Sequence, residues 1–173
     1  MKTNSNLRRA SPMALVLLGT ALLAGVSLWL NAQEDVLQTS NPDLRALRAQ
    51  QTSLRMFGID DPMARMKSPD RQALEMLDNT ASSADCELRA AIDLLAVYEN
   101  LQSEVDRAMM KPLLADRLRL YSRLLGFDAE KAALPLGPPS IIKLETTSKK
   151  ALNLRDDVIA AKNKLDSIAA SLR

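Results

Sequence analysis

The chain has 173 residues, of which 47% are hydrophobic and 25% are charged, and its formal net charge is +2. This balance is typical of a folded chain and excludes wholesale disorder or a collagen-like fibre. The chain has no His and one Cys, which excludes His-based catalytic triads, imidazole metal sites and an intramolecular disulfide. We therefore expect no metal and no cofactor.

The first feature along the chain is an uncharged segment, residues 10–33, rich in Leu, Ala and Val. As a helix it would be about 36 Å long, enough to cross a hydrocarbon layer of about 30 Å. Three basic residues precede it and two acidic residues follow it at once. The positive-inside rule therefore predicts a single-pass inner-membrane protein, with residues 1–9 in the cytoplasm and the C-terminus in the periplasm.

A cleaved signal peptide has the same topology and stays open as an alternative. Its apolar region usually has about 7–15 residues and ends in small residues before the cleavage site. The segment here is longer, and the best-placed site, Leu30-Asn31-Ala32, begins with a bulky Leu. We favour a retained anchor, whereas cleavage would make the mature protein periplasmic or secreted.

The basic balance of the chain comes from its first nine residues. Beyond residue 33 there are 20 basic and 21 acidic residues. The exported part is therefore nearly neutral, and its charge does not favour nucleic-acid binding.

Residues 34–134 are predicted to form a helical bundle, because helix start and stop signals repeat along them and no strand-like alternation does. Asn41-Pro42-Asp43 combines a cap, a first-turn Pro and an acid, and Gly58 follows the last apolar position of that helix. Ser68-Pro69-Asp70 repeats the start signal and is expected to open a short helix that ends near Asn79.

A long helix is predicted over residues 83–111, after a weak capping box at Ser82. Pro112 is expected to break or kink it, and Gly126 to stop the helix that follows. Asp128 would then cap one or two further turns. The predicted apolar face of the long helix consists of Leu88, Ile92, Leu95, Tyr98, Leu101, Val105 and Met109.

Cys86 is expected in the first turn of this long helix. A buried, inert thiol is the favoured interpretation. Because the compartment is oxidising, an intermolecular disulfide through Cys86 is the alternative.

Residues 135–139 contain three prolines and are predicted to be a stiff linker before a long C-terminal helix over residues 140–173. This helix has a coiled-coil-like heptad repeat of about four heptads. The a positions are Leu144, Ala151, Val158, Leu165 and Leu172, and the d positions are Thr147, Leu154, Ala161 and Ile168.

The C-terminal seam is the predicted partner interface, with Leu144, Leu154, Val158, Leu165 and Ile168 as its residues. Lysines dominate the flanking e and g positions, so two parallel copies would bring like charges together. A homodimer through this helix is therefore not favoured. We expect the helix to pack on residues 83–125 of its own chain or on an acidic partner.

No catalytic motif stands out, since the chain lacks G-x-S-x-G, a P-loop, G-x-G-x-x-G and C-x-x-C. We do not expect an enzyme. The favoured interpretation is a non-catalytic, membrane-anchored extracytoplasmic scaffold or adaptor that pairs with other cell-envelope proteins. The alternative is a cleaved, soluble helical carrier or chaperone with an apolar groove.

Overall fold

The computed structural model describes residues 41–57 and 62–172, and this part of the chain contains helices and no strand. The predicted all-α class is therefore confirmed. The predicted anchor, residues 10–33, and the predicted stop at Gly58 lie outside the described residues. Within them, no helix is both long enough and apolar enough to cross a membrane. The elements are α2 (Pro42–Phe57), α3 (Pro62–Lys67), α4 (Arg71–Glu99), α5 (Glu104–Ala133), the 3₁₀ turn η1 (Leu134–Leu136) and α6 (Glu145–Ser171).

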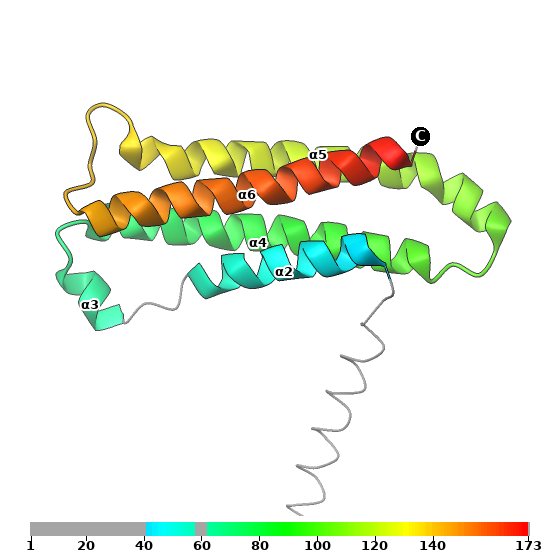
Figure 1. Cartoon of the computed structure of the whole chain (residues 1–173), viewed down its shortest axis with the longest axis horizontal. Helices are drawn as coiled ribbons and strands as arrows, with labels where there is room; N and C mark the ends of the chain where they lie inside the picture. Colours follow the sequence, from blue (N-terminus) through cyan, green and yellow to red (C-terminus); the bar gives the residue numbers. More distant parts are fainter. Residues whose placement is uncertain (1–40, 58–61, 173) are drawn as a thin grey trace, which may run out of the picture. The chain divides into compact units, whose positions relative to one another are not determined.

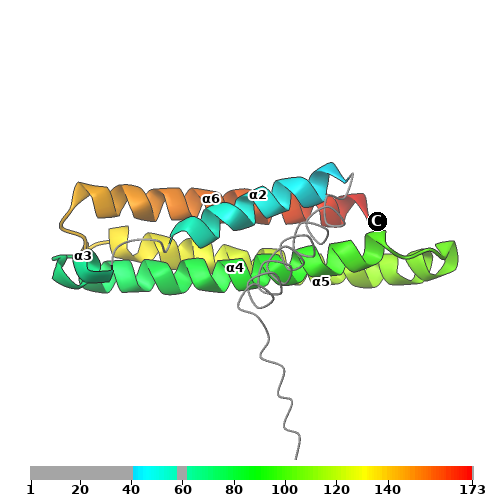
Figure 2. The same cartoon turned by 90° about the horizontal axis from the view of Figure 1, so that it is seen from below.

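The four longer helices of residues 41–172 form an up-down-up-down bundle (Figure 1). Figure 2 shows two layers, with α2 beside α6 and α4 beside α5. Each helix contacts its two neighbours, so the bundle is closed around one core. Leucines and alanines fill this core, and fully buried leucines come from all four helices, namely Leu44, Leu47, Leu77, Leu88, Leu118, Leu125, Leu154 and Leu165.

The start of α2 follows the predicted capping signal. The side-chain oxygen of Asn41 accepts a hydrogen bond from the backbone N–H of Asp43 at 2.8 Å. The same side chain donates to Glu99 at 2.8 Å, at the far end of α4. One residue therefore caps α2 and ties it to its neighbour.

The predicted helix end near Asn79 is wrong, because α4 runs without interruption from Arg71 to Glu99. Residues 79–84 contain neither Gly nor Pro, and the predicted start at Ser82 lies in the middle of the helix. Leu77, Ala81, Ala84 and Leu88 are buried at helical spacing, so one apolar face passes through the polar stretch.

The break predicted at Pro112 lies instead at residues 100–103, between α4 and α5. Ser103 caps α5 by accepting a hydrogen bond from the backbone N–H of Asp106 at 3.3 Å. Pro112 lies inside α5 on an exposed turn, where water can replace the lost intrahelical partner. Val105 and Met109 belong to this new helix and are exposed, so the predicted apolar face ends before them.

Gly126 does not stop α5, which continues to Ala133, and Asp128 lies inside the helix and caps nothing. A Cβ at position 126 would lie 3.6 Å from Cε of Lys162 on α6. The glycine marks the place where this long side chain crosses α5. A Gly in a helix costs about 1 kcal/mol relative to Ala. The packing of α5 against α4 and α6 outweighs that cost.

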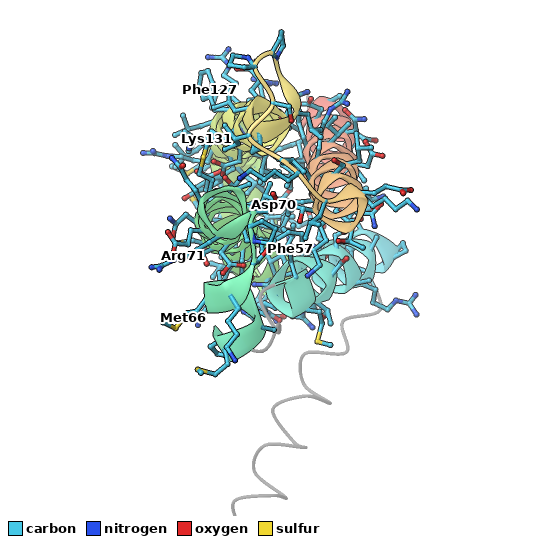
Figure 3. The ribbon with its side chains drawn as sticks, turned by 90° about the vertical axis from the view of Figure 1, so that its left-hand side faces the viewer. Phe57, Met66, Asp70, Arg71, Phe127 and Lys131 are labelled. Carbon is cyan, nitrogen blue, oxygen red and sulfur yellow. The ribbon has the colours of Figure 1, made fainter. Side chains whose placement is uncertain are left out.

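Asp70 joins the starts of α4 and α6, which lie at the same end of the bundle (Figure 3). Its carboxylate accepts hydrogen bonds from the backbone N–H groups of Lys143 at 2.7 Å and Leu144 at 2.8 Å, and Asp70 is buried. Burial raises the pKa of Asp70, but these hydrogen bonds, with one from Thr147, outweigh it and lower the pKa. The negative charge also lies at the positive end of the α6 dipole.

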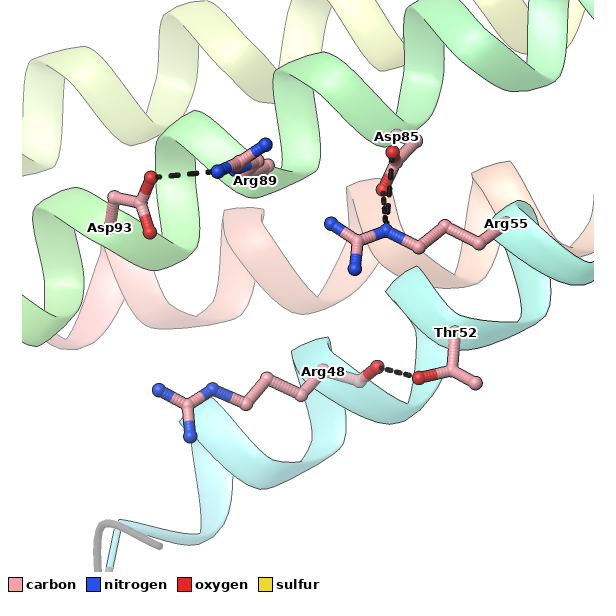
Figure 4. A network of polar contacts seen from close by, with 6 residues as sticks. All are labelled: Arg48, Thr52, Arg55, Asp85, Arg89 and Asp93. Atoms are coloured by element: carbon pink, nitrogen blue, oxygen red, sulfur yellow. Dashed lines mark hydrogen bonds and ion pairs between the residues drawn. The ribbon is translucent and has the colours of Figure 1, made fainter. Parts of the chain in front are cut away.

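Surface ion pairs connect the remaining helices. Arg55 of α2 donates to the carboxylate of Asp85 of α4 at 3.1 and 3.3 Å, beside the looser Arg89–Asp93 pair (Figure 4). Lys164 of α6 donates to Asp43 of α2 at 2.6 Å. Exposed pairs of this kind contribute about 0–1 kcal/mol each, so the apolar core and Asp70 fix the arrangement.

We predict that Asp70→Asn lowers the free energy of unfolding of the full chain by about 1–3 kcal/mol, because it weakens two charge-assisted hydrogen bonds in a buried place. Because the pKa of Asp70 is lowered on folding, its contribution is present above the ordinary carboxyl pKa and is lost as the pH falls. Denaturant unfolding followed by circular dichroism measures both effects. Asp156→Asn, at an exposed site on α6, is the control, and an equal loss in the two variants would contradict the role of Asp70.

Candidate functional site

The predicted partner interface on the C-terminal helix packs inside the chain's own bundle. Leu154, Val158, Leu165 and Ile168 are buried against the other helices, and only Leu144 is substantially exposed. The sequence left two options open for this helix, packing within its own chain or packing on an acidic partner. In the structure, the apolar seam of α6 packs on α5, α4 and α2. Whether a partner binds stays a prediction, but the surface for it must come from other residues.

Cys86 lies near the middle of α4 and is exposed. The expectation of a buried thiol in the first turn of a helix is therefore wrong, because the helix begins fifteen residues earlier, at Arg71. An exposed thiol can reach another molecule, so an intermolecular bond through Cys86 stays a prediction.

An apolar groove runs between α4 and α5 and encloses a cavity of about 450 Å³. Aliphatic side chains and two tyrosines form most of its walls, and one acid and one base, Asp93 and Arg117, lie across it from each other on the two helices. Its lining consists of Ala90, Asp93, Leu94, Val97 and Tyr98 of α4 and Met110, Leu113, Leu114, Arg117 and Tyr121 of α5.

A row of exposed apolar side chains continues from this groove along the outer side of α5. Leu113, Leu120 and Phe127 are 51%, 42% and 59% exposed and follow one another at seven-residue intervals. Figure 3 shows Phe127 on the outer side of the bundle. Seven residues are nearly two helical turns, so these side chains lie along one edge of the helix. The groove and the row share Leu113, and we call them together the α4–α5 face.

A buried pair of carboxyl groups lies between the same two helices. Asp128 of α5 is fully buried, and one of its oxygens accepts a hydrogen bond from Lys131 at 2.8 Å. Its other oxygen and Oε2 of Glu87 on α4 are buried without a hydrogen-bond donor. Burial, and then the adjacent Asp128 carboxylate, raise the pKa of Glu87 to about 7, so Glu87 holds its proton well above the usual carboxyl range.

The sequence signal for the α4–α5 face is a second apolar row on α5, which is hard to tell apart from the helical pattern of the core residues. Leu114, Leu118, Tyr121 and Leu125 follow a helical apolar pattern on α5, and each is one to two positions from a residue of the exposed row. A second apolar row at the same spacing, on the opposite side of the helix, is the pattern of a helix with two packing partners. Basic residues that the sequence places near this row, Arg117 and Arg123, are exposed beside it.

The described residues contain no group of three or more Cys, Asp or Glu side chains that could hold a metal ion. Comparison of the chain with protein-family models, curated proteins and solved structures finds no match. The geometry of the site is that of an open apolar groove with one acid and one base in its lining.

We predict that the free energy of unfolding of the wild-type chain falls as the pH rises from about 4.5 to about 7, because the folded state binds the Glu87 proton more tightly than the unfolded state does. Glu87→Gln keeps a neutral donor between the helices at every pH. The variant should lose this part of the pH dependence and be more stable than the wild type above about pH 7.

Unfolding measured at several pH values checks this prediction, with Glu104→Gln, at an exposed site in the first turn of α5, as the control. If Glu87→Gln and the wild type give parallel curves, folding does not raise the pKa of Glu87.

Proposed function

We propose that this chain is a non-catalytic, membrane-anchored extracytoplasmic adaptor that docks a helix of a protein partner on its α4–α5 face. The observation that supports this most is the apolar groove together with the exposed row of α5, which the helices of residues 41–57 and 62–172 leave uncovered. Soluble proteins rarely keep a contiguous apolar surface of this kind without a partner for it.

The shape of the face favours a helix as the bound element. A groove between two adjacent antiparallel helices accepts the apolar side chains of a third helix, which are spaced along it at three and four residues. Tyr98 and Tyr121 offer rigid apolar area with a polar tip, the kind of residue that dominates binding energy at protein interfaces. Asp93 and Arg117 supply charges of both signs at the edges, which favours a protein over a uniformly anionic surface.

A carrier for a small apolar molecule is the second candidate, because the cavity of about 450 Å³ is of the size that holds one. This candidate needs the groove alone, whereas docking of a helix also needs Leu120 and Phe127, which lie outside the cavity lining. Substitution of Leu120 therefore separates the two, since it should impair helix docking and leave the uptake of a small ligand unchanged.

The anchor part of the proposal rests on residues 10–33 and on the charges around them. We predict that a reporter enzyme that is active only after export, fused after Arg173, is active, because the positive-inside rule places the C-terminus outside the cytoplasm. The fusion protein should also remain with the membrane after an alkaline wash. An inactive reporter at normal expression would contradict the topology, and release by the wash would contradict a retained anchor.

We predict that a photo-reactive amino acid at position 120 cross-links the chain to a protein in intact cells, whereas the same residue at position 152 does not. Leu120 on α5 and Leu152 on α6 are both 42% exposed, so they differ in the helix that presents them and not in accessibility. Adducts seen by immunoblotting at 120 alone support docking on the α4–α5 face. Equal adducts at both positions, or none at 120, would contradict it.

A further inference from the structure

The exposed row of α5 has a charged flank whose sign alternates. Asp116, Arg123 and Glu130 are exposed and follow one another at seven-residue intervals, in step with the apolar row. They lie on the side of the row that faces away from α4, because the other side is occupied by residues that line the groove, such as Leu114 and Tyr121. On α5, exposed acids beside the row lie on this flank alone, since the groove side carries Arg117 and Lys131.

An alternating flank of this kind matches an antiparallel copy of itself. In an antiparallel helix pair, the same flank of each helix meets its counterpart along one side of the contact. If the pair is centred near Leu120, Asp116 lies beside Arg123 of the partner subunit, and Arg123 lies beside the partner's Asp116. Leu113 then lies near the partner's Phe127, which buries about 21 Å of the apolar row on each helix.

Other occupants fit the flank less well. A parallel copy leaves Arg123 without an acid, because the groove side of the row on α5 carries the exposed cations Arg117 and Lys131 and no exposed carboxylate. An anionic lipid surface would attract Arg123 and repel Asp116 and Glu130. Like charges on the Lys-rich flanks of α6 would repel each other in a homodimer. The α5 flank carries both signs, so this repulsion does not oppose a homodimer through α5.

We propose that the α4–α5 face is the interface of an antiparallel homodimer, in which the apolar rows of two α5 helices pack together and Asp116 and Arg123 form two reciprocal ion pairs. This inference rests on the proposed function, of which it names the partner as a second copy of the chain. Asp116 also pairs with Arg119 of its own helix at 2.6 Å, but its side chain is 74% exposed and can accept a second cation. The two α4 helices lie on the same side of the pair. Val97, an exposed residue of the groove lining on α4, therefore lies near the partner subunit.

A charge-exchange series on the full chain in detergent, followed by sedimentation equilibrium, tests the arrangement. The wild type should be a dimer, and Arg123→Asp should weaken dimerisation by about tenfold or more, because the two-fold axis makes the reversal act twice. The double variant Asp116→Arg with Arg123→Asp should restore the dimer. Arg155→Asp, at an exposed site on α6, is the matched control and should leave the dimer unchanged.

A second measurement keeps the test independent of the ion pairs. In a Cys86→Ser background, a short bifunctional thiol reagent should join two subunits that carry Leu120→Cys, and it should not join two subunits that carry Leu152→Cys. A monomeric wild-type chain, or a double variant that does not regain the dimer, would overturn the homodimer. If the chain is monomeric and position 120 still photo-cross-links to a different protein, the homodimer is wrong and the proposed function stands, whereas no protein adduct at 120 contradicts both.

Discussion

The arrangement of the bundle depends on the buried carboxylate of Asp70. It lies at the start of α4 and binds the two backbone N–H groups just before α6, so two helices that are 74 residues apart begin at one place. A buried carboxylate without donors would cost several kcal/mol, which penalises any other placement of α6. With α4 and α6 held parallel, α5 must run antiparallel between them, and its inner side is filled by the core.

The same constraint determines which surface remains for recognition. Because the apolar seam of α6 packs in the core, its buried residues, Leu154, Val158 and Leu165, cannot also bind a partner. The α2–α6 layer is closed by polar contacts, such as Lys164 with Asp43. The α4–α5 layer instead has apolar side chains on both sides of α5, one row inside and one outside. Between these two helices lie the carboxyl groups of Glu87 and Asp128. Burial raises the pKa of Glu87, whereas hydrogen bonds from backbone N–H groups lower the pKa of Asp70.

Local signals predicted the helical class, the start of α2 and the buried positions of the C-terminal helix, because capping residues and apolar periodicity act over a few residues. They failed where tertiary contacts decide. The polar stretch at Ser82 stays helical because Ala81 and Ala84 continue the buried face. Gly126 stays helical because the buried residues on either side of it, Leu125 and Ala129, continue the core face of α5. The α4–α5 face could not be predicted because its row, Leu113, Leu120 and Phe127, lies next to core residues in sequence. Only the packing of the other helices on α5 shows which of the two apolar rows is buried. The pairing of Asp70 with residues 143 and 144 has no local signal at all.

The rate at which a thiol reagent labels position 120 in native membranes shows whether the α4–α5 face is occupied. Leu120→Cys and Leu152→Cys, each in a Cys86→Ser background, present side chains whose parent leucines are equally exposed at 42%. Rates are normalised to those of the unfolded chain. If the α4–α5 face is occupied in the cell envelope, position 120 should be labelled several-fold more slowly than position 152. Equal rates at the two positions would show that the face is bare and would contradict the account.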